Sequence, residues 1–237
     1  MRRSVRRSRG FALAEVIVAG TLLVLVVQVA WWVTAMQSVV AARVVAEARM
    51  LDETRLIHHL LSTEVGHGES GEDWGVNGGE LHLRAFRGVG FACRTQPASG
   101  WRVAVAGYRF PDSDKDSVLV LSDDGSWRVS ALGRRSRRRT LDCQELDGFS
   151  TETWFLDPPR PRGVAALYFE NGAYRFSDDA FRYRISNRRW QPLTGPEIAV
   201  DSSAVVATGP DGVEVIVTWR VLDPIRPSTR WKLWVRR

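Results

Sequence analysis

The stretch FALAEVIVAGTLLVLVVQVAWWV, residues 11–33, sets the organisation of this chain. It contains a single ionisable group, Glu15. As an α-helix with a rise of about 1.5 Å per residue it would be roughly 35 Å long, enough to cross a hydrocarbon core of about 30 Å. The apolar region of a secretory signal is shorter, at about 7–15 residues. The sequence therefore predicts one helix that spans a membrane.

An arginine-rich tip precedes the apolar segment and predicts its orientation. Basic residues that flank a membrane span stay on the cytoplasmic side, so we expect a short cytoplasmic N-terminus and an extracytoplasmic remainder. Trp31 and Trp32 lie where an aromatic belt would meet the membrane interface. The first nine positions hold five arginines and no acid: Arg2, Arg3, Arg6, Arg7 and Arg9.

The net charge of +6 comes mostly from this tip. Five of the 33 basic residues precede Gly10, which leaves 28 basic residues against 27 acidic ones in the rest of the chain. A broad basic surface for a polyanion is therefore not indicated, and nucleic acid is not among the partners that we expect.

Glu15 is the exception inside the apolar segment. A carboxylate within a membrane costs about 2.5–3.5 kcal/mol even on insertion scales, so an intramembrane acid is a functional candidate. Two interpretations are open. Glu15 lies near the start of the segment, where its side chain can reach the membrane interface; alternatively, it is retained for a specific contact.

The stretch from Arg9 to Glu15 resembles the class III leader of type IV pilins and type II secretion pseudopilins. That pattern has a short basic leader, a terminal Gly, Phe as the first mature residue and Glu as the fifth. Gly10, Phe11 and Glu15 match it, and Ala12 departs from it because Thr or Ser is usual there. The chain is therefore identified as resembling the pilin superfamily, through residues 1–35 alone.

The resemblance implies that prepilin peptidase removes residues 1–10 by cutting after Gly10 and methylates the new terminus at Phe11. A glycine offers no side chain that would obstruct a protease. The cut would expose an α-amine with an ordinary pKa of about 7.7–8.0, which is largely cationic at neutral pH. This cation is a natural partner for Glu15, within one chain or across a filament contact, and it makes Glu15 the candidate assembly residue.

The same resemblance implies partners and a location. The partners are prepilin peptidase, other pilins or pseudopilins that pack through the N-terminal helix, and the inner-membrane assembly platform. The location is the bacterial inner membrane, crossed once, with a cytoplasmic N-terminus, a periplasmic or otherwise extracytoplasmic C-terminal domain, and transfer into a filament.

Two other export signals compete with this interpretation. A cleavable secretory signal ending near Ala30 or Ala35 would need an unusually long apolar core that contains a Glu. A twin-arginine signal could use Arg6 and Arg7, but Arg9 would then occupy a place where an aromatic or apolar residue is expected.

Strong helix formers continue beyond the apolar segment, without Pro or Gly over residues 21–65. We expect one helix with a transmembrane half over 11–35 and a periplasmic half over 36–65, followed by a β-rich globular domain over 66–237. The expected fold class is α+β, with the long N-terminal helix packed on a mainly antiparallel β-sheet.

Runs of alternating apolar residues after Glu80 predict the strands of this sheet. Asn171-Gly172 stands between two of these runs and is the clearest predicted hairpin turn. The composition predicts loops over 66–79, 111–116, 133–140 and 157–163. The predicted strands are 80–86, 101–110, 117–121, 126–132, 164–170, 173–177, 181–186, 213–222 and 231–236.

The two cysteines, Cys93 and Cys143, both lie in the part predicted outside the cytoplasm. A disulfide between them is one possibility in an oxidising periplasm and would close a loop of about 50 residues, worth about 4 kcal/mol. Two unrelated thiols are the other, because the geometry of a disulfide cannot be taken from sequence.

An acidic segment offers a candidate calcium site. Asp112, Asp114 and Asp116 alternate as at the start of a calcium-binding loop, but Ser117 stands where such a loop requires Gly. A polar turn leading into the strand at 117–121 explains the same residues.

A basic segment is a candidate anion-binding loop for lipid headgroups, an acidic partner or DNA. A solvated loop is the competing interpretation, because no aromatic residue is interleaved for stacking. Its basic residues are Arg134, Arg135, Arg137, Arg138 and Arg139.

No other pattern points to catalysis or to a cofactor. His58, His59 and His67, taken with Glu64, match no zinc spacing, and solvent-facing histidines on a helix explain them. The sequence has no phosphate loop, no nucleophile elbow and no dinucleotide fingerprint, so we expect neither an enzyme nor a bound cofactor or metal.

The function expected from the resemblance is that of a minor pilin, or of a minor pseudopilin of the J type. Such a subunit primes or caps the assembly of a type II secretion pseudopilus or a type IV pilus. The alternative is a membrane-anchored periplasmic binding module, for DNA or a secreted substrate, that carries a pilin-type leader.

Overall fold

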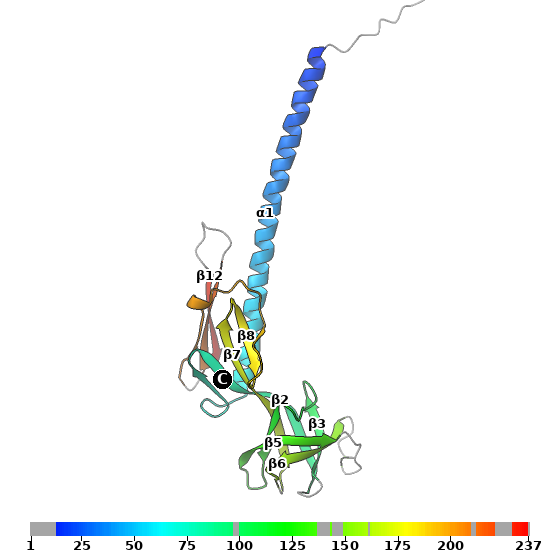
Figure 1. Ribbon diagram of the computed structural model, residues 1–237, viewed down its shortest axis with the longest axis vertical. Helices are drawn as coiled ribbons and strands as arrows, with labels where there is room; N and C mark the ends of the chain where they lie inside the picture. Colours follow the sequence, from blue (N-terminus) through cyan, green and yellow to red (C-terminus); the bar gives the residue numbers. More distant parts are fainter. Residues whose placement is uncertain are drawn as a thin grey trace, which may run out of the picture. The chain divides into compact units, whose positions relative to one another are not determined.

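The computed structural model describes residues 13–96, 100–136, 143, 149–160, 162–209, 212–220 and 229–236. The chain divides into two compact units, Met1–Asp52 and Glu53–Arg237. One helix, α1 (Leu13–Gly66), begins in the first unit and ends in the second (Figure 1). It stops at Gly66, where the first glycine after a long run of helix formers interrupts the sequence.

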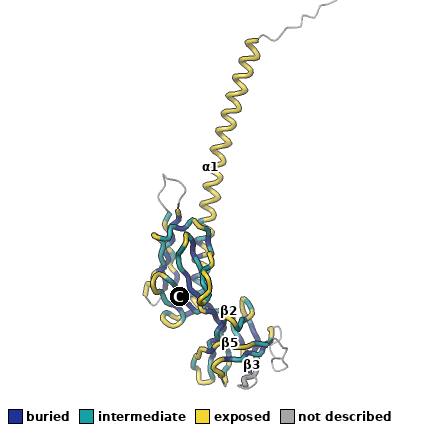
Figure 2. Tube along the Cα trace, viewed as in Figure 1, coloured by how far each residue is buried: buried dark blue, intermediate teal, exposed yellow. Residues whose placement is uncertain are grey.

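The two parts of α1 differ in burial (Figure 2). Every residue over 13–49 is exposed, including the whole apolar stretch. In the second unit, buried side chains recur every three or four residues, at Thr54, Ile57, Leu61 and Val65, and this spacing places them on one helix face against the β domain. Within the described residues, α1 is the one helix that is long and apolar enough to cross a membrane. This confirms the expectation of a single apolar helix of spanning length.

The remainder of the second unit is mostly antiparallel β structure, which confirms the α+β class. A short 3₁₀ turn, Val200–Ser202, precedes β10. The strands are β1 (Trp74–Asn77), β2 (Glu80–Gln96), β3 (Gly100–Gly107), β4 (Asp116–Leu121), β5 (Trp127–Ser136), β6 (Ser150–Asp157), β7 (Ala165–Ser177), β8 (Ala180–Ile185), β9 (Gln191–Pro192), β10 (Ala204–Ala207), β11 (Gly212–Trp219) and β12 (Thr229–Arg236).

The expectation of one sheet is corrected by the topology. The larger sheet runs β1-β2-β3-β6-β5-β4-β7-β8-β9, and an additional pairing of β2 with β7 closes six of these strands into a barrel. A separate sheet has the order β10-β11-β12. Alternation within each strand cannot show this closure, because it fixes which residues share a face but not which strands become neighbours.

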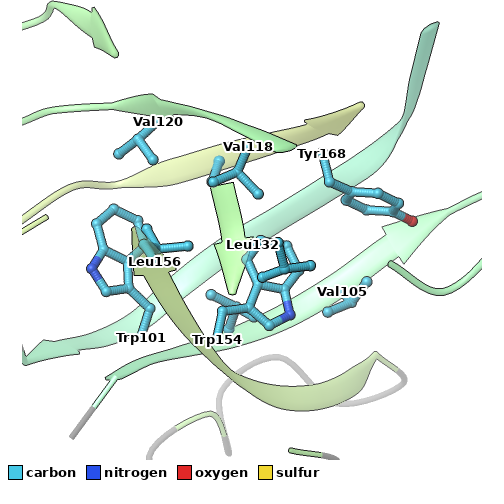
Figure 3. Close-up of a cluster of buried hydrophobic side chains, with 10 residues drawn as sticks. Trp101, Val105, Val118, Val120, Leu132, Trp154, Leu156 and Tyr168 are labelled. Carbon is cyan, nitrogen blue, oxygen red and sulfur yellow. The ribbon is translucent and has the colours of Figure 1, made fainter. Parts of the chain in front are cut away.

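The barrel is filled by large side chains from five of its strands (Figure 3). Trp154 is fully buried and packs edge-on against Tyr168 with ring centroids 5.9 Å apart, and Trp101 belongs to the same cluster, together with aliphatic side chains of β4 and β5. Gly90 makes room for this filling, because a Cβ there would lie 2.4 Å from the Trp154 ring. Any larger residue at position 90 would displace the indole.

The second core of this unit lies where α1 meets strands outside the barrel. The Trp219 indole of β11 donates to Thr54 Oγ1 of α1 at 3.2 Å, and both residues are buried. The Gly195 amide donates to the Glu53 carboxylate at 3.2 Å. These contacts attach the end of α1 to the β domain through segments distant in sequence.

The hairpin predicted at Asn171-Gly172 is wrong. β7 runs straight through both residues, since Gly172 pairs with Leu83 of β2 on one side and with Ile185 of β8 on the other. The glycine is required by packing, because a Cβ there would lie 2.7 Å from the Tyr183 ring. The turn lies further on, at Asp178 and Asp179, which both have positive φ angles of 46° and 62°.

Other boundaries also differ from those predicted. β6 was not predicted. Its sequence, STETWFLD, does not alternate between polar and apolar residues, although the barrel buries every second residue of the central part of the strand. The short strands β1, β9 and β10 were not predicted either. The predicted loop over 133–140 is wrong for residues 133–136, which form the end of β5, while residues 137–140 lie outside the described part.

A disulfide joins Cys93, in β2, to Cys143, with a Cα–Cα distance of 5.2 Å. Of the two possibilities that the sequence left open, the structure therefore contains the cross-link. It closes a loop of 50 residues that includes β3, β4 and β5.

Candidate functional site

The processing residues predicted from the leader, Gly10 and Phe11, lie outside the described residues. Glu15 is described and lies in the first turn of α1, exposed together with its apolar neighbours. Its position is favourable in one respect, because a carboxylate near a helix N-terminus interacts well with the helix dipole. The first candidate site is therefore this acidic first turn on an exposed apolar helix.

A second candidate, which we call the charged cluster, lies within the second unit and was not predicted. Its centre is Glu170 of β7, which accepts from Arg87 Nε at 3.0 Å, from Arg109 Nη2 at 3.1 Å and from the Tyr183 hydroxyl at 3.0 Å. Lys115 lies 3.9 Å from the same carboxylate. One buried acid is thus surrounded by three cations.

Two further acids balance these cations. Arg87 Nη1 donates to Glu64 of α1 at 2.6 Å. Arg109 donates to both oxygens of Asp116 at 2.6 Å, in the bidentate geometry that guanidinium and carboxylate groups favour. The charged cluster therefore contains three acids and three bases, contributed by α1, β2, the β3–β4 connection, β4 and β7.

A β-bulge places Arg87 in this cluster. β2 pairs with β7 at Phe86 and again at Gly88, so Arg87 is the extra residue between them. The bulge also changes which alternate residues of β2 point inward. Leu83 and Ala85 are buried before it, whereas Gly88 and Gly90 face the barrel interior after it. Bulges commonly re-aim a side chain in this way.

A cavity of about 490 Å³ opens beside the charged cluster. Tyr108 lies along it and is 80% exposed. This volume is within the range of about 300–1,000 Å³ that is typical of small-molecule sites. Its lining residues are Leu60, Glu64, Arg87, Tyr108, Arg109, Glu170, Tyr174, Tyr183 and Leu193.

Burial and charge shift the pKa values of the cluster in different directions. Burial raises the pKa of Glu64, although the charge of Arg87 opposes it. Burial acts upward on Glu170 too, but Arg87, Tyr183 and Arg109 outweigh it and its pKa is lowered. Burial raises the pKa of Tyr174 and of Tyr183. At neutral pH the cluster therefore holds an ionised Glu170 among neutral tyrosines.

The candidate calcium residues are not grouped as metal ligands. Asp116 is buried and bound by Arg109, while Asp112 accepts from the Asp114 amide at 3.0 Å in a tight turn. Among the residues that the structure describes, no three acidic, His or Cys side chains are close enough to hold a metal ion. The arrangement corresponds to the polar turn that leads into β4.

The candidate anion-binding arginines are also placed differently from the expectation. Arg135 donates to the buried carboxylate of Glu152 at 2.9 Å, and Arg134 lies over the Phe155 ring at 5.5 Å. Both belong to β5 and have partners within the barrel. Arg137, Arg138 and Arg139 lie outside the described residues.

The three histidines of the helix region are exposed: His58 and His59 lie near the end of α1, and His67 directly follows it.

Comparison with known families, curated proteins and solved structures finds no match to this chain.

Proposed function

We propose that this chain is a pilin-like subunit, anchored in the bacterial inner membrane by α1 and processed after Gly10. The observation that carries the proposal is the conjunction of an arginine-rich tip, Gly10-Phe11 and a lone Glu15 at the start of a long apolar helix. A helix that is exposed and, apart from Glu15, apolar on every side over 13–33 requires lipid or other apolar helices around it.

The role proposed within that class is a minor pilin or minor pseudopilin that primes or caps a filament. The part of the helix with the acid serves assembly, and the β domain of the second unit serves recognition. The chain is oriented with its arginine-rich tip in the cytoplasm and its β domain outside the cytoplasm. The α-amine freed at Phe11 pairs with Glu15, which offsets the cost of an acid in the membrane.

The test is the mass of the N-terminal peptide of the full-length chain from cells with and without an active prepilin peptidase. We expect a methylated terminus at Phe11 only with the peptidase. Gly10→Val should abolish the cut, because the added side chain lies at the scissile bond. Gly20→Ala is the matched control, since no atom lies within 4 Å of the added Cβ. An intact Met1 terminus, or a cut near residue 30 or 35, would reject the proposal.

A second function uses the same anchor for a periplasmic binding module, and the cavity beside the charged cluster favours it. Substitution of the exposed Tyr108 by Ala separates the two functions in cells. Loss of secretion or DNA uptake with filaments intact would favour the binding module. Filament loss in Glu15→Leu with a normal phenotype in Tyr108→Ala would favour the structural subunit.

A further inference from the structure

The outer surface of the barrel carries an apolar face that the function above does not use. Residues that alternate with the buried core point outward from β5, β4, β7 and β2, and their registers align them in rows across the strands. One row joins Val129, Leu119, Leu167 and Val89. The adjacent row joins Trp127, Leu121, Ala165 and Phe91.

We define these eight residues as the outer face. All are apolar, and three are substantially exposed: Trp127 at 49%, Val129 at 42% and Phe91 at 41%. The exposed ring of Phe149 extends the face by an edge-on contact with Phe91 at 6.3 Å. Along β6, by contrast, the outward positions include Thr151 and Thr153. The barrel thus has an apolar side and a more polar side.

The exposed area is appreciable. Aromatic side chains bury roughly 150–250 Å² each, so partly exposed Trp and Phe rings with their aliphatic neighbours present roughly 400–600 Å² of apolar surface. This matches the largest apolar patch of a typical monomer, a size that commonly marks an interaction site. Two such faces packed together would bury roughly 800–1,200 Å², which is near the lower end of specific interfaces.

The charges beside the outer face favour a second copy of this chain over a lipid surface. The β4–β5 turn, which adjoins Leu121 and Trp127, carries the exposed Asp123, Asp124 and Arg128, and the exposed Arg162 lies three residues before β7, whose first residue Ala165 belongs to the same row. Both signs therefore occur along the same rim. A two-fold contact requires a patch to be complementary to itself, which a rim of both signs allows, whereas attraction to an anionic membrane requires an excess of cations.

We propose that two copies of this chain associate through their outer faces, with the β5-β4-β7-β2 sheet of one packed on that of the other. Paired sheets pack about 10 Å apart with interdigitated apolar side chains. The modest area predicts a reversible contact, favoured where anchoring concentrates the chain in a membrane.

The test is photo-crosslinking of the full-length chain in detergent and in membranes, with benzoylphenylalanine in place of Trp127. We expect a covalent dimer whose cross-linked peptide comes from β4 or β7 of the second copy. The same probe in place of Thr151, on β6, is the matched control and should give little or no dimer. Association through α1 alone would not join position 127 to these strands.

Val129→Lys supplies the second measurement. A lysine against an apolar partner is an unpaired buried charge, so the dimer yield should fall roughly tenfold or more. Thr151→Lys should leave the yield unchanged, and thermal unfolding of both variants shows that the barrel is intact. A lipid adduct, a cross-link to a different protein, or a dimer unaffected by Val129→Lys would overturn the proposal.

Discussion

Tryptophan and valine have opposite surroundings in the two units of this chain. In the first unit, Trp31 and Trp32 are largely exposed, together with a continuous run of Val and Leu. In the barrel, Trp101 and Trp154 are buried. The difference comes from geometry: a closed sheet provides an interior, whereas a single helix that is apolar all round provides none. The same residue types therefore require lipid or a partner in one unit and form a core in the other.

The barrel should be the region most sensitive to loss of a single side chain. Trp154→Ala removes a fully buried indole, so we expect a loss of about 3–5 kcal/mol in the free energy of unfolding. Circular dichroism with denaturant measures this on the full-length chain in detergent. Trp127→Ala, on the barrel exterior, should cost much less, and neither change should release the chain from membranes. Equal losses of unfolding free energy in Trp154→Ala and Trp127→Ala would contradict the placement of Trp154 in the barrel interior.

The disulfide should contribute a comparable amount of stability, and only to the second unit. Cys93→Ser opens a loop of 50 residues, which in the chain-entropy description costs about 4 kcal/mol of stability. Reductant should reproduce this loss in the unmodified chain and have no effect on the variant. Membrane retention should not change in either case, because the cross-link lies outside α1. If reductant still lowered the stability of Cys93→Ser, its effect could not be assigned to the disulfide, and the prediction would be wrong.

The first unit should respond to charge rather than to lost volume. Leu25→Arg places a cation near the middle of the apolar stretch, at a cost of about 2.5–3.5 kcal/mol for membrane insertion. Alkaline extraction of membranes measures the released fraction, which should rise, while the unfolding of the β domain stays unchanged. Leu25→Phe is the control and should remain in the membrane. Release of both variants equally would show that the segment does not insert.

Substitutions in the charged cluster should have the smallest effect on the free energy of unfolding, and that effect should depend on pH. Because the pKa of Glu170 is lowered on folding, its contribution is present above the ordinary glutamate pKa and is lost as the pH falls through the folded value. Glu170→Gln should therefore cost about 1.5–3 kcal/mol at pH 7 and reduce the loss of stability on acidification.

Glu64→Gln is the matched comparison for this prediction. The pKa of Glu64 is raised, so its contribution is present below the ordinary pKa and is lost as the pH rises through the folded value. Its replacement should cost less at pH 7 than that of Glu170. Denaturant unfolding between about pH 3 and pH 8 measures the free energy of unfolding of both variants. A larger loss for Glu64→Gln would contradict the assignment of Glu170 as the centre of the cluster.

Sequence patterns were sufficient for the features that depend on near neighbours along the chain. The apolar run and the absence of Pro and Gly predicted a helix that the structure places at Leu13–Gly66. Alternation predicted most strands, and the Asp112–Asp116 turn was one of two interpretations considered. Local propensity is informative here because hydrogen bonds within a helix, and the faces of a strand, are set by residues a few positions apart.

Tertiary structure alone decided the rest, because it depends on which distant segments meet. Barrel closure by β2 and β7, the bulge at Arg87 and the gathering of two further acids and three bases around Glu170 all depend on residues far apart in sequence. Asn171-Gly172 shows the limit most clearly. A strong turn signal was overridden by two flanking strands that satisfy its backbone and by a tyrosine ring that requires its glycine.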